Sequence, residues 1–226
     1  MTIDQAFNAT IEYYDSWMKA ALPNFHDLFQ AGVDVLTFDS QAEISVLDLG
    51  AGTGLFSQQV AQKYPHAHFD LYDVADQMLN VARLRFQGSP HKIHTIVGDY
   101  RELDTSRRYD LVISSLSIHH LSDEEKRMLF RKIYAVLNKP GMFVNIDQVL
   151  GETEYLRQLY WNHWLEQVHS SGQPEERIHD SIQRRQTYDR ESLLSDQLAW
   201  MKAAGLDNVD CVYKNFFVAV LFGTKA

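Results

Sequence analysis

A nine-residue stretch, Val46–Gly54, constrains the fold of this chain more than any other part of the sequence. The apolar run that leads into it, Ile44 to Leu49, is typical of a buried parallel strand. The three glycines that follow stand at every second position, and a helical pattern begins directly after the last of them. A strand, a turn without side chains and a helix start present free backbone N–H groups to a ligand. The stretch therefore predicts a small-molecule site at this turn.

Strand and helix patterns alternate after this turn. Apolar runs predict strands at 68–74, 92–97, 109–114 and 142–149, and amphipathic patterns predict helices at 76–86 and 122–137. Ser122 and Glu125 have the spacing of a capping box, and Lys139-Pro140-Gly141 predicts a turn. Such alternation predicts an α/β fold, a Rossmann-like and mostly parallel sheet with helices on both faces.

The segments outside this core complete a single domain. Residues 1–40 are expected to form an N-terminal helical lid, with helices at 4–21 and 25–38, and residues 41–150 the cofactor-binding core. Residues 151–190 are expected to form a helical insertion near the acceptor site, with an aromatic helix at 153–169 and a solvated charged stretch at 177–190. Residues 191–226 predict a last helix at 191–204 and a C-terminal hairpin of strands 209–213 and 216–222.

Composition excludes several classes of protein. The chain has 226 residues, of which 45% are hydrophobic, enough for one sizeable core. The net charge of −9 argues against broad nucleic-acid binding, and we expect no membrane span and no signal peptide. The single cysteine, Cys211, offers no internal disulfide, which favours a cytoplasmic protein.

Carboxylates stand at the carboxyl ends of the predicted strands, where ligands bind in open α/β sheets. Asp48 ends the first strand, Asp73 the second, and Asp99 follows the third. Carboxylates suit a ribose, an amine and a cationic sulfur, whereas they would repel a pyrophosphate. The Gly-x-Gly-x-Gly spacing also differs from the Gly-x-Gly-x-x-Gly of dinucleotide-binding folds. The sequence therefore favours a nucleoside ligand over a phosphate ligand.

The motifs Val46–Gly54, Asp73, Gly98-Asp99 and Tyr109–Ile113, in this order, resemble those of the class I S-adenosylmethionine-dependent methyltransferases. The resemblance implies a seven-stranded sheet with an antiparallel last strand, and S-adenosylmethionine as the cofactor. It implies that Asp73 binds the ribose hydroxyls and Asp99 the adenine amine. The residues that we expect at the cofactor are Asp48, Gly50, Ala51, Gly52, Gly54, Asp73, Val74, Asp99, Tyr100 and Ser115.

Two candidates for catalysis follow from the same comparison. The stretch that begins with His120-Leu121-Ser122 is similar to phosphoethanolamine N-methyltransferases, whose catalytic histidine matches His120 and whose lid tyrosine corresponds to Tyr13 or Tyr14. We take His120 and Tyr14 as the catalytic candidates. One of the two adjacent histidines, His119 and His120, is expected to pack in the interior while the other points into the pocket.

No metal site is expected, because His119, His120, Asp147 and His163 offer no tight i, i+4 ligand pair.

The sequence leaves open both the methyl acceptor and the reaction. A small-molecule acceptor with a nitrogen or oxygen nucleophile is favoured, so we expect a methyltransferase of small molecules. The whole-chain layout is also similar to the carboxy-S-adenosylmethionine synthase of tRNA wobble uridine modification, in which an arginine, matched approximately by Arg184 or Arg185, holds a carboxylate. A non-catalytic cofactor-binding partner protein is a further alternative. Nucleic-acid methylation is a minor alternative, since Ser114–Ser117 replaces the base-flipping motif. The aromatic helix at 153–169 offers a surface for a homodimer.

Overall fold

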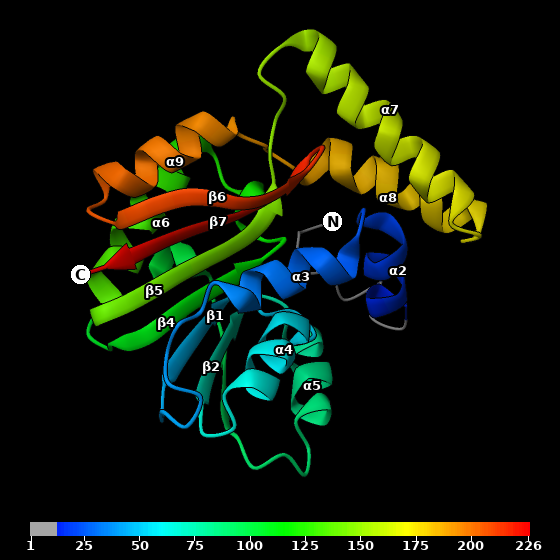
Figure 1. Cartoon of the computed structure of the whole chain (residues 1–226). Helices are drawn as coiled ribbons and strands as arrows, with labels where there is room; N and C mark the ends of the chain where they lie inside the picture. Colours follow the sequence, from blue (N-terminus) through cyan, green and yellow to red (C-terminus); the bar gives the residue numbers. More distant parts are fainter. Residues whose placement is uncertain (1–12) are drawn as a thin grey trace.

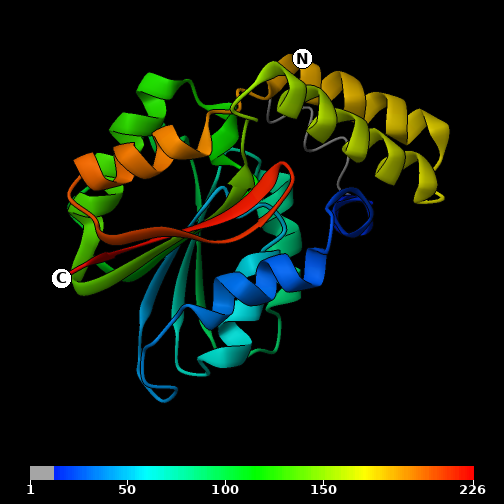
Figure 2. The same cartoon turned by 45° about the horizontal axis from the view of Figure 1, so that its top comes forward.

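A seven-stranded sheet forms the centre of the molecule, with helices on both faces (Figure 1, Figure 2). The computed structural model describes residues 13–226. The strand order is β3-β2-β1-β4-β5-β7-β6. The strands from β3 to β5 pair in parallel, and β7 runs antiparallel to both of its neighbours, β5 and β6. This confirms the Rossmann-like fold with an antiparallel last strand. The strands are β1 Ser45–Leu49, β2 His68–Asp73, β3 Lys92–Val97, β4 Tyr109–Ser115, β5 Leu137–Gln148, β6 Asp207–Asn215 and β7 Val218–Lys225.

Each face of the sheet has its own apolar core. Successive residues of a strand point to opposite faces, so Val46 packs into one core and Leu47 into the other. The first core lies beneath α3 (Phe25–Asp34), α4 (Leu55–Lys63) and α5 (Asp76–Arg85). The second lies beneath α6 (Asp123–Val136) and α9 (Leu194–Ala203). The capping box predicted at the start of α6 is confirmed.

The turn predicted at Lys139-Pro140-Gly141 is wrong, because β5 runs without a break from Leu137 to Gln148. Its pairing with β4 instead shifts register, from Tyr109 opposite Leu137 to Leu111 opposite Met142. Asn138, Lys139 and Pro140 have no partner in either register, and β7 pairs with the other edge of β5 from Gly141 onward. The predicted break is therefore an irregularity within one long strand.

The charged stretch at 177–190, expected to be a solvated face, is mostly the helix α8 (Glu175–Tyr188), and one side of that helix is buried. Ile178 and Ser181 are buried, and the side chain of Arg185 is only 10% exposed. These positions recur at i, i+3 and i+7, so they share one face of the helix. That face packs inward, whereas the acidic residues Glu175, Glu176 and Asp180 are exposed.

The N-terminal segment divides into two parts. The first half of the helix expected at 4–21 lies outside the described residues, and its second half is α2 (Tyr14–Ala21). The helix expected at 25–38 ends earlier, at Asp34, and Leu28 and Phe29 bury it against the sheet. Of the described part of the expected lid, α2 therefore reaches the carboxyl ends of the strands, while α3 is a core helix.

The helix α7 (Glu154–Ser170) and α8 extend beyond the end of the sheet, with α2 beside them (Figure 1, Figure 2). The last helix, expected from 191, begins three residues later, and the C-terminal hairpin is confirmed as β6 and β7. None of the helices within residues 13–226 is long and apolar enough to cross a membrane.

The segment between α8 and α9 is fixed to α6 by a buried lysine. Lys126 is fully buried, and its Nζ donates to the carbonyl oxygen of Arg190 and, over 2.5 Å, to Ser192 Oγ. The backbone N–H of Arg190 in turn donates to the carbonyl of His119 over 2.8 Å. These bonds place residues 189–192 beside the loop that follows β4.

We predict that Lys126→Met lowers the free energy of unfolding by about 2 kcal/mol, because buried hydrogen bonds from a charged donor are lost. Urea unfolding followed by circular dichroism measures the change. Arg131→Met, at an exposed position of the same helix, serves as the control and should change the free energy of unfolding by less than about 0.5 kcal/mol. An equal effect of both substitutions would contradict the role of Lys126.

Candidate active site

One pocket lies at the carboxyl ends of the first four strands, where the chain reverses its direction of travel across the sheet. After β1 the chain passes to β2 and β3 on one side, and then returns to β4 on the other. Open α/β sheets bind ligands at such a switch point. We call this the first pocket. Eight of the predicted site residues line it: Tyr14, Gly50, Gly52, Asp73, Val74, Asp99, Tyr100 and His120.

The glycine turn forms one wall of the first pocket. Gly50 has φ +70°, and a Cβ atom there would overlap the side chain of Ser117. The N–H groups of Gly50 and Ala51 donate to the carbonyl of Tyr72, over 2.8 and 3.1 Å. The turn is thus held against β2, and its backbone borders the pocket directly because no side chain intervenes.

Asp73 is held in a fixed orientation at the end of β2. Its Oδ2 accepts from Gly52 N and its Oδ1 from Ala75 N, both over 2.8 Å. Burial raises the pKa of this carboxyl, while these backbone N–H groups oppose the shift. Each carboxylate oxygen can accept a second hydrogen bond, so the group retains capacity for a ligand hydroxyl.

Asp99 lines the first pocket but already has a strong partner. Arg101 donates to it from its backbone N over 2.8 Å and from its guanidinium over 2.7 and 2.5 Å, and also reaches Glu125 Oε1 over 3.1 Å. Although burial alone would raise the pKa of Asp99, the hydrogen bonds from Arg101 lower it. Arg101 was not among the predicted site residues, although its position two residues after Asp99 was visible in the sequence.

Four predicted site residues lie outside the lining of the first pocket. Gly54 has φ +77°, and a Cβ atom added to it would lie 3.2 Å from the side chain of Ala82 on α5. Glycine at this position therefore allows the start of α4 to lie close to α5. Ala51 is buried within the turn, and Ser115 precedes Leu116 and Ser117, which do line the pocket.

Asp48, the fourth, is fully buried behind the turn. Its Oδ2 accepts from Ser57 Oγ over 2.6 Å, and its Oδ1 has no hydrogen-bond partner among residues 13–226. Burial raises the pKa of Asp48 to about 7, against the hydrogen bond from Ser57, which lowers it. A carboxyl in this position is protonated more readily than an exposed one.

A second pocket adjoins the first and shares Tyr14, Leu116 and His120 with it. Its other walls come from α2, α7 and α8, so the insertion reaches the region where an acceptor was expected. Burial raises the pKa of Tyr14, so its hydroxyl remains protonated. Tyr13 instead packs its ring against Arg177, with the guanidinium carbon 4.3 Å from the ring centre. Of the two tyrosines considered for the lid, Tyr14 therefore borders both pockets.

Two arginines of α8 line the second pocket, Arg184 and Arg185. The Arg185 guanidinium pairs with Glu191 over 2.6 Å and lies 4.5 Å from the ring of Trp164. Its Nη1 is buried and has no hydrogen-bond partner among residues 13–226. A guanidinium with a spare N–H beside an apolar wall suits an anionic group of a ligand.

The adjacent histidines differ in burial: His119 is buried but also lines the second pocket, and His120 borders both pockets. His119 Nδ1 lies 2.5 Å from Asp147 Oδ1, and its Nε2 lies 3.5 Å from Asp189 Oδ1. Burial alone would lower the pKa of His119, but the charges of Asp147 and Asp189 raise it to about 10. Burial, and then the charge of His119, lower the pKa of His120.

Asp189 joins this cluster, although no sequence pattern predicts it there. It lies 69 residues after His120 in the stretch expected to be solvated. His163, considered as part of the same cluster, stacks on Phe216 with 3.8 Å between ring centres and lines neither pocket.

Comparisons with known proteins agree with this geometry. Residues 46–141 match the family model of a methyltransferase domain. A malonyl-[acyl-carrier protein] O-methyltransferase of Ilyobacter polytropus is 25% identical over 62% of this chain and 49% of its own length. The chain thus spans about half the length of that relative. A carboxy-S-adenosyl-L-methionine synthase of Nautilia profundicola is 20% identical over 97% of this chain and 99% of its own length.

Solved structures share the fold. An O-methyltransferase family 2 protein from Planctomyces limnophilus, in complex with apigenin, superposes with a TM-score of 0.66 at 18% identity, over 99% of this chain and 62% of its own. Human N-acetylserotonin methyltransferase in complex with S-adenosylmethionine gives a TM-score of 0.63 at 18% identity, over 99% of this chain and 58% of its own.

The fold and the carboxylate-lined first pocket define an α/β protein with a pocket at the glycine turn. More particularly, residues 46–141 match the model of a methyltransferase domain, and the expected resemblance to the S-adenosylmethionine-dependent methyltransferases is confirmed.

We predict a pH-dependent stability difference between the wild type and Asp48→Asn. The pKa of Asp48 is raised on folding from an ordinary value of 3.8 to about 7, so its contribution to stability is greatest below 3.8 and is lost as the pH rises to about 7. Between roughly pH 5.5 and 7, the unfolding free energy of the wild type should fall by about 1–2 kcal/mol relative to the variant, and the difference should then level off. Urea unfolding without ligand measures it, and a constant difference across this range would contradict the shift.

Proposed function

We propose that the chain transfers a methyl group from S-adenosylmethionine to a small-molecule acceptor with a nitrogen or oxygen nucleophile. The observation that carries the proposal is the contact between the two pockets, which share Tyr14, Leu116 and His120. A cofactor in the first pocket and an acceptor in the second would meet at these side chains. Such alignment of the two reactants is the main task of an enzyme that catalyses a displacement.

The first pocket suits this cofactor, which supplies a methyl group on a positively charged sulfur when bound. Gly50 and Gly52 leave room for close approach of the ligand to the backbone. Asp73 would accept hydrogen bonds from the ribose hydroxyls, with Val74 beside it. Asp99, together with Tyr100, would border the adenine, and its carboxylate would accept from the adenine amine in addition to Arg101.

Residues outside the lining support this site indirectly. Asp48, Ala51 and Gly54 shape the turn and its junction with α4, while Ser115 positions the two residues after it.

Tyr14 and His120 are the groups that we propose to contact the acceptor. Tyr14 comes from α2, which covers the junction of the pockets from the N-terminal side, so it would also exclude water. His120 comes from the short helix η2 (Ile118–His120) that follows β4. We also propose that the protein acts in the cytoplasm. We further propose that it forms a homodimer through α7, where the side chains of Tyr155 and Leu159 are exposed.

We predict that Asp73→Ala weakens the binding of S-adenosylhomocysteine by at least about fivefold, equivalent to about 1 kcal/mol, because a hydroxyl acceptor and an anchor of the glycine turn are both lost. Isothermal titration calorimetry measures the affinity. Asp76→Ala, at an exposed carboxylate on α5, is the matched control and should bind as the wild type does. Unchanged affinity of Asp73→Ala would exclude this cofactor site.

We predict that His120→Ala and Tyr14→Phe each lower turnover by more than about tenfold, because both groups would act at the acceptor. Their affinity for S-adenosylhomocysteine should stay within about threefold of the wild type. Formation of S-adenosylhomocysteine with a panel of amines, phenols and carboxylic acids measures turnover, and His163→Ala, outside both pockets, is the control. Activity at the wild-type level in both variants would contradict their assignment, and cofactor binding without turnover on any acceptor would favour a non-catalytic partner protein.

A carboxy-S-adenosylmethionine synthase is the second candidate function. It is favoured by the match to such an enzyme along 97% of this chain and by the two arginines in the second pocket, which suit a carboxylate. Mass spectrometry separates the two functions. A methylated acceptor together with S-adenosylhomocysteine supports the methyltransferase, whereas a carboxylated form of the cofactor supports the synthase.

A further inference from the structure

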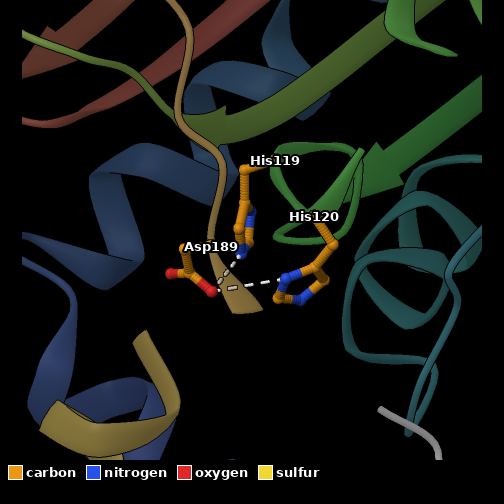
Figure 3. Close-up of side chains that lie close together, drawn as sticks. All are labelled: His119, His120 and Asp189. Atoms are coloured by element: carbon orange, nitrogen blue, oxygen red, sulfur yellow. Dashed lines mark ion pairs between the residues drawn. The ribbon is translucent and has the colours of Figure 1, made fainter. Parts of the chain in front are cut away.

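Three side chains converge beside the junction of the two pockets (Figure 3). His119 and His120 come from η2, and Asp189 from the segment between α8 and α9. Asp189 Oδ1 lies 3.5 Å from His119 Nε2 and 3.3 Å from His120 Nδ1. The three side chains are 4%, 10% and 8% exposed, and one ligand atom from each lies within 4.8 Å of the other two.

We propose that His119, His120 and Asp189 bind a divalent transition-metal ion of the zinc type. Two imidazole nitrogens and one carboxylate oxygen are a ligand set that zinc prefers. Metal–ligand bonds of about 2.0–2.1 Å in a tetrahedron separate neighbouring ligand atoms by about 3.3–3.4 Å. The two nitrogen–oxygen distances, 3.3 and 3.5 Å, are close to this separation, so both could be bridged with little movement.

The groups around the trio support this role. A histidine that binds a metal usually donates its other ring N–H to a carboxylate, which fixes the ring. His119 has such a partner, because its Nδ1 lies 2.5 Å from Asp147 Oδ1. Asp189 Oδ2 accepts from Gln148 Nε2 over 2.9 Å, which leaves Oδ1 directed at the two imidazoles.

The backbone also holds the ligands together. The bond from Arg190 N to the carbonyl of His119 joins the two segments that supply them, and Lys126 fixes Arg190 from behind. The ligands are thus positioned by three separate parts of the chain, although Asp189 is far from the histidines in sequence.

The local charge balance favours a divalent cation. Asp147 is buried and the Asp189 side chain is 8% exposed, and with His119 protonated between them this region carries one net negative charge, which replacement of the proton at His119 Nε2 by a divalent ion would neutralise. Buried carboxylates need a compensating charge. The cations near the same region are Lys126, Arg184 and Arg185. Lys126 already donates to Arg190 and Ser192, and Arg185 is already paired with Glu191. Gln148 also faces His119, with 3.1 Å between Nε2 atoms, but it is uncharged.

A site with three protein ligands keeps a position for another molecule, as catalytic zinc sites do. His120 borders both pockets, so an ion bound to it would lie where the cofactor and acceptor pockets meet. The proposal concerns binding of the ion and does not depend on the proposed methyl transfer, which allows the two to be tested separately.

Cobalt(II) tests the proposal, because it replaces zinc and its visible absorption reports the ligands. The untagged full-length protein is treated with a chelator, dialysed and titrated with CoCl₂, and then with ZnCl₂ in competition. We expect saturation at one equivalent, visible absorption bands of a nitrogen- and oxygen-ligated ion, and displacement by zinc. Absence of saturable binding of both ions by the wild type would overturn the proposal, whatever the activity of the protein.

Variants test the ligands. Asp189→Asn and His120→Gln should each weaken cobalt binding by more than about tenfold, and Asp147→Asn, beyond the ligands, by about tenfold or more. His94→Ala, a histidine on β3 outside both pockets, is the matched control and should bind cobalt as the wild type does. Circular dichroism and binding of S-adenosylhomocysteine verify that each variant is folded. Cobalt binding of wild-type strength in folded Asp189→Asn and His120→Gln would place the ion elsewhere and overturn the assignment.

Discussion

The hydrogen bond from Gly52 N to Asp73 Oδ2 is the contact on which the site depends, since it ties the glycine turn after β1 to the end of β2. The turn can take this position because Gly50 has a positive φ and no Cβ that would meet Ser117. Parallel pairing of β1 with β2 on one side and β4 on the other then brings three loops to one place. The first pocket is a consequence of this arrangement, in which one carboxylate both shapes the wall and remains available to a ligand.

The region beyond the pocket depends on a second set of contacts, made by the segment between α8 and α9. Lys126 and the backbone of His119 hold this segment against η2, and Asp189 is placed between the two histidines as a result. The insertion thereby contributes to the walls of both pockets. The same contacts place the proposed acceptor groups and the proposed metal ligands at one junction, and His120 belongs to both sets.

Much of the fold could be predicted from the sequence, because it follows from local patterns. The apolar run before Gly50 and the capping box at Ser122 each specify an element without reference to the rest of the chain. Asp73 could be assigned to the pocket because the carboxyl ends of parallel strands meet at one edge of the sheet.

The remaining features depend on contacts between distant segments. The ion pair between Arg101 and Asp99, the burial of Arg185 and the approach of Asp189 to His120 are all tertiary contacts. No periodicity marks Asp189, and the charges around Arg185 resemble those of an exposed helix. The break predicted at Pro140 is wrong for a related reason, because Leu137 before it pairs with β4 and the residues from Gly141 onward pair with β7, so the strand continues on both sides of it.

We infer that the pocket at the glycine turn selects a nucleoside with a cationic or neutral sulfur over a phosphate-bearing one. Calorimetric titration of the wild-type protein with S-adenosylmethionine, S-adenosylhomocysteine, ATP and NAD⁺ under one set of conditions tests this selectivity. We expect saturable binding of the two sulfur nucleosides at one site and no measurable binding of ATP or NAD⁺. Binding of ATP or NAD⁺ as tight as that of S-adenosylmethionine would contradict it.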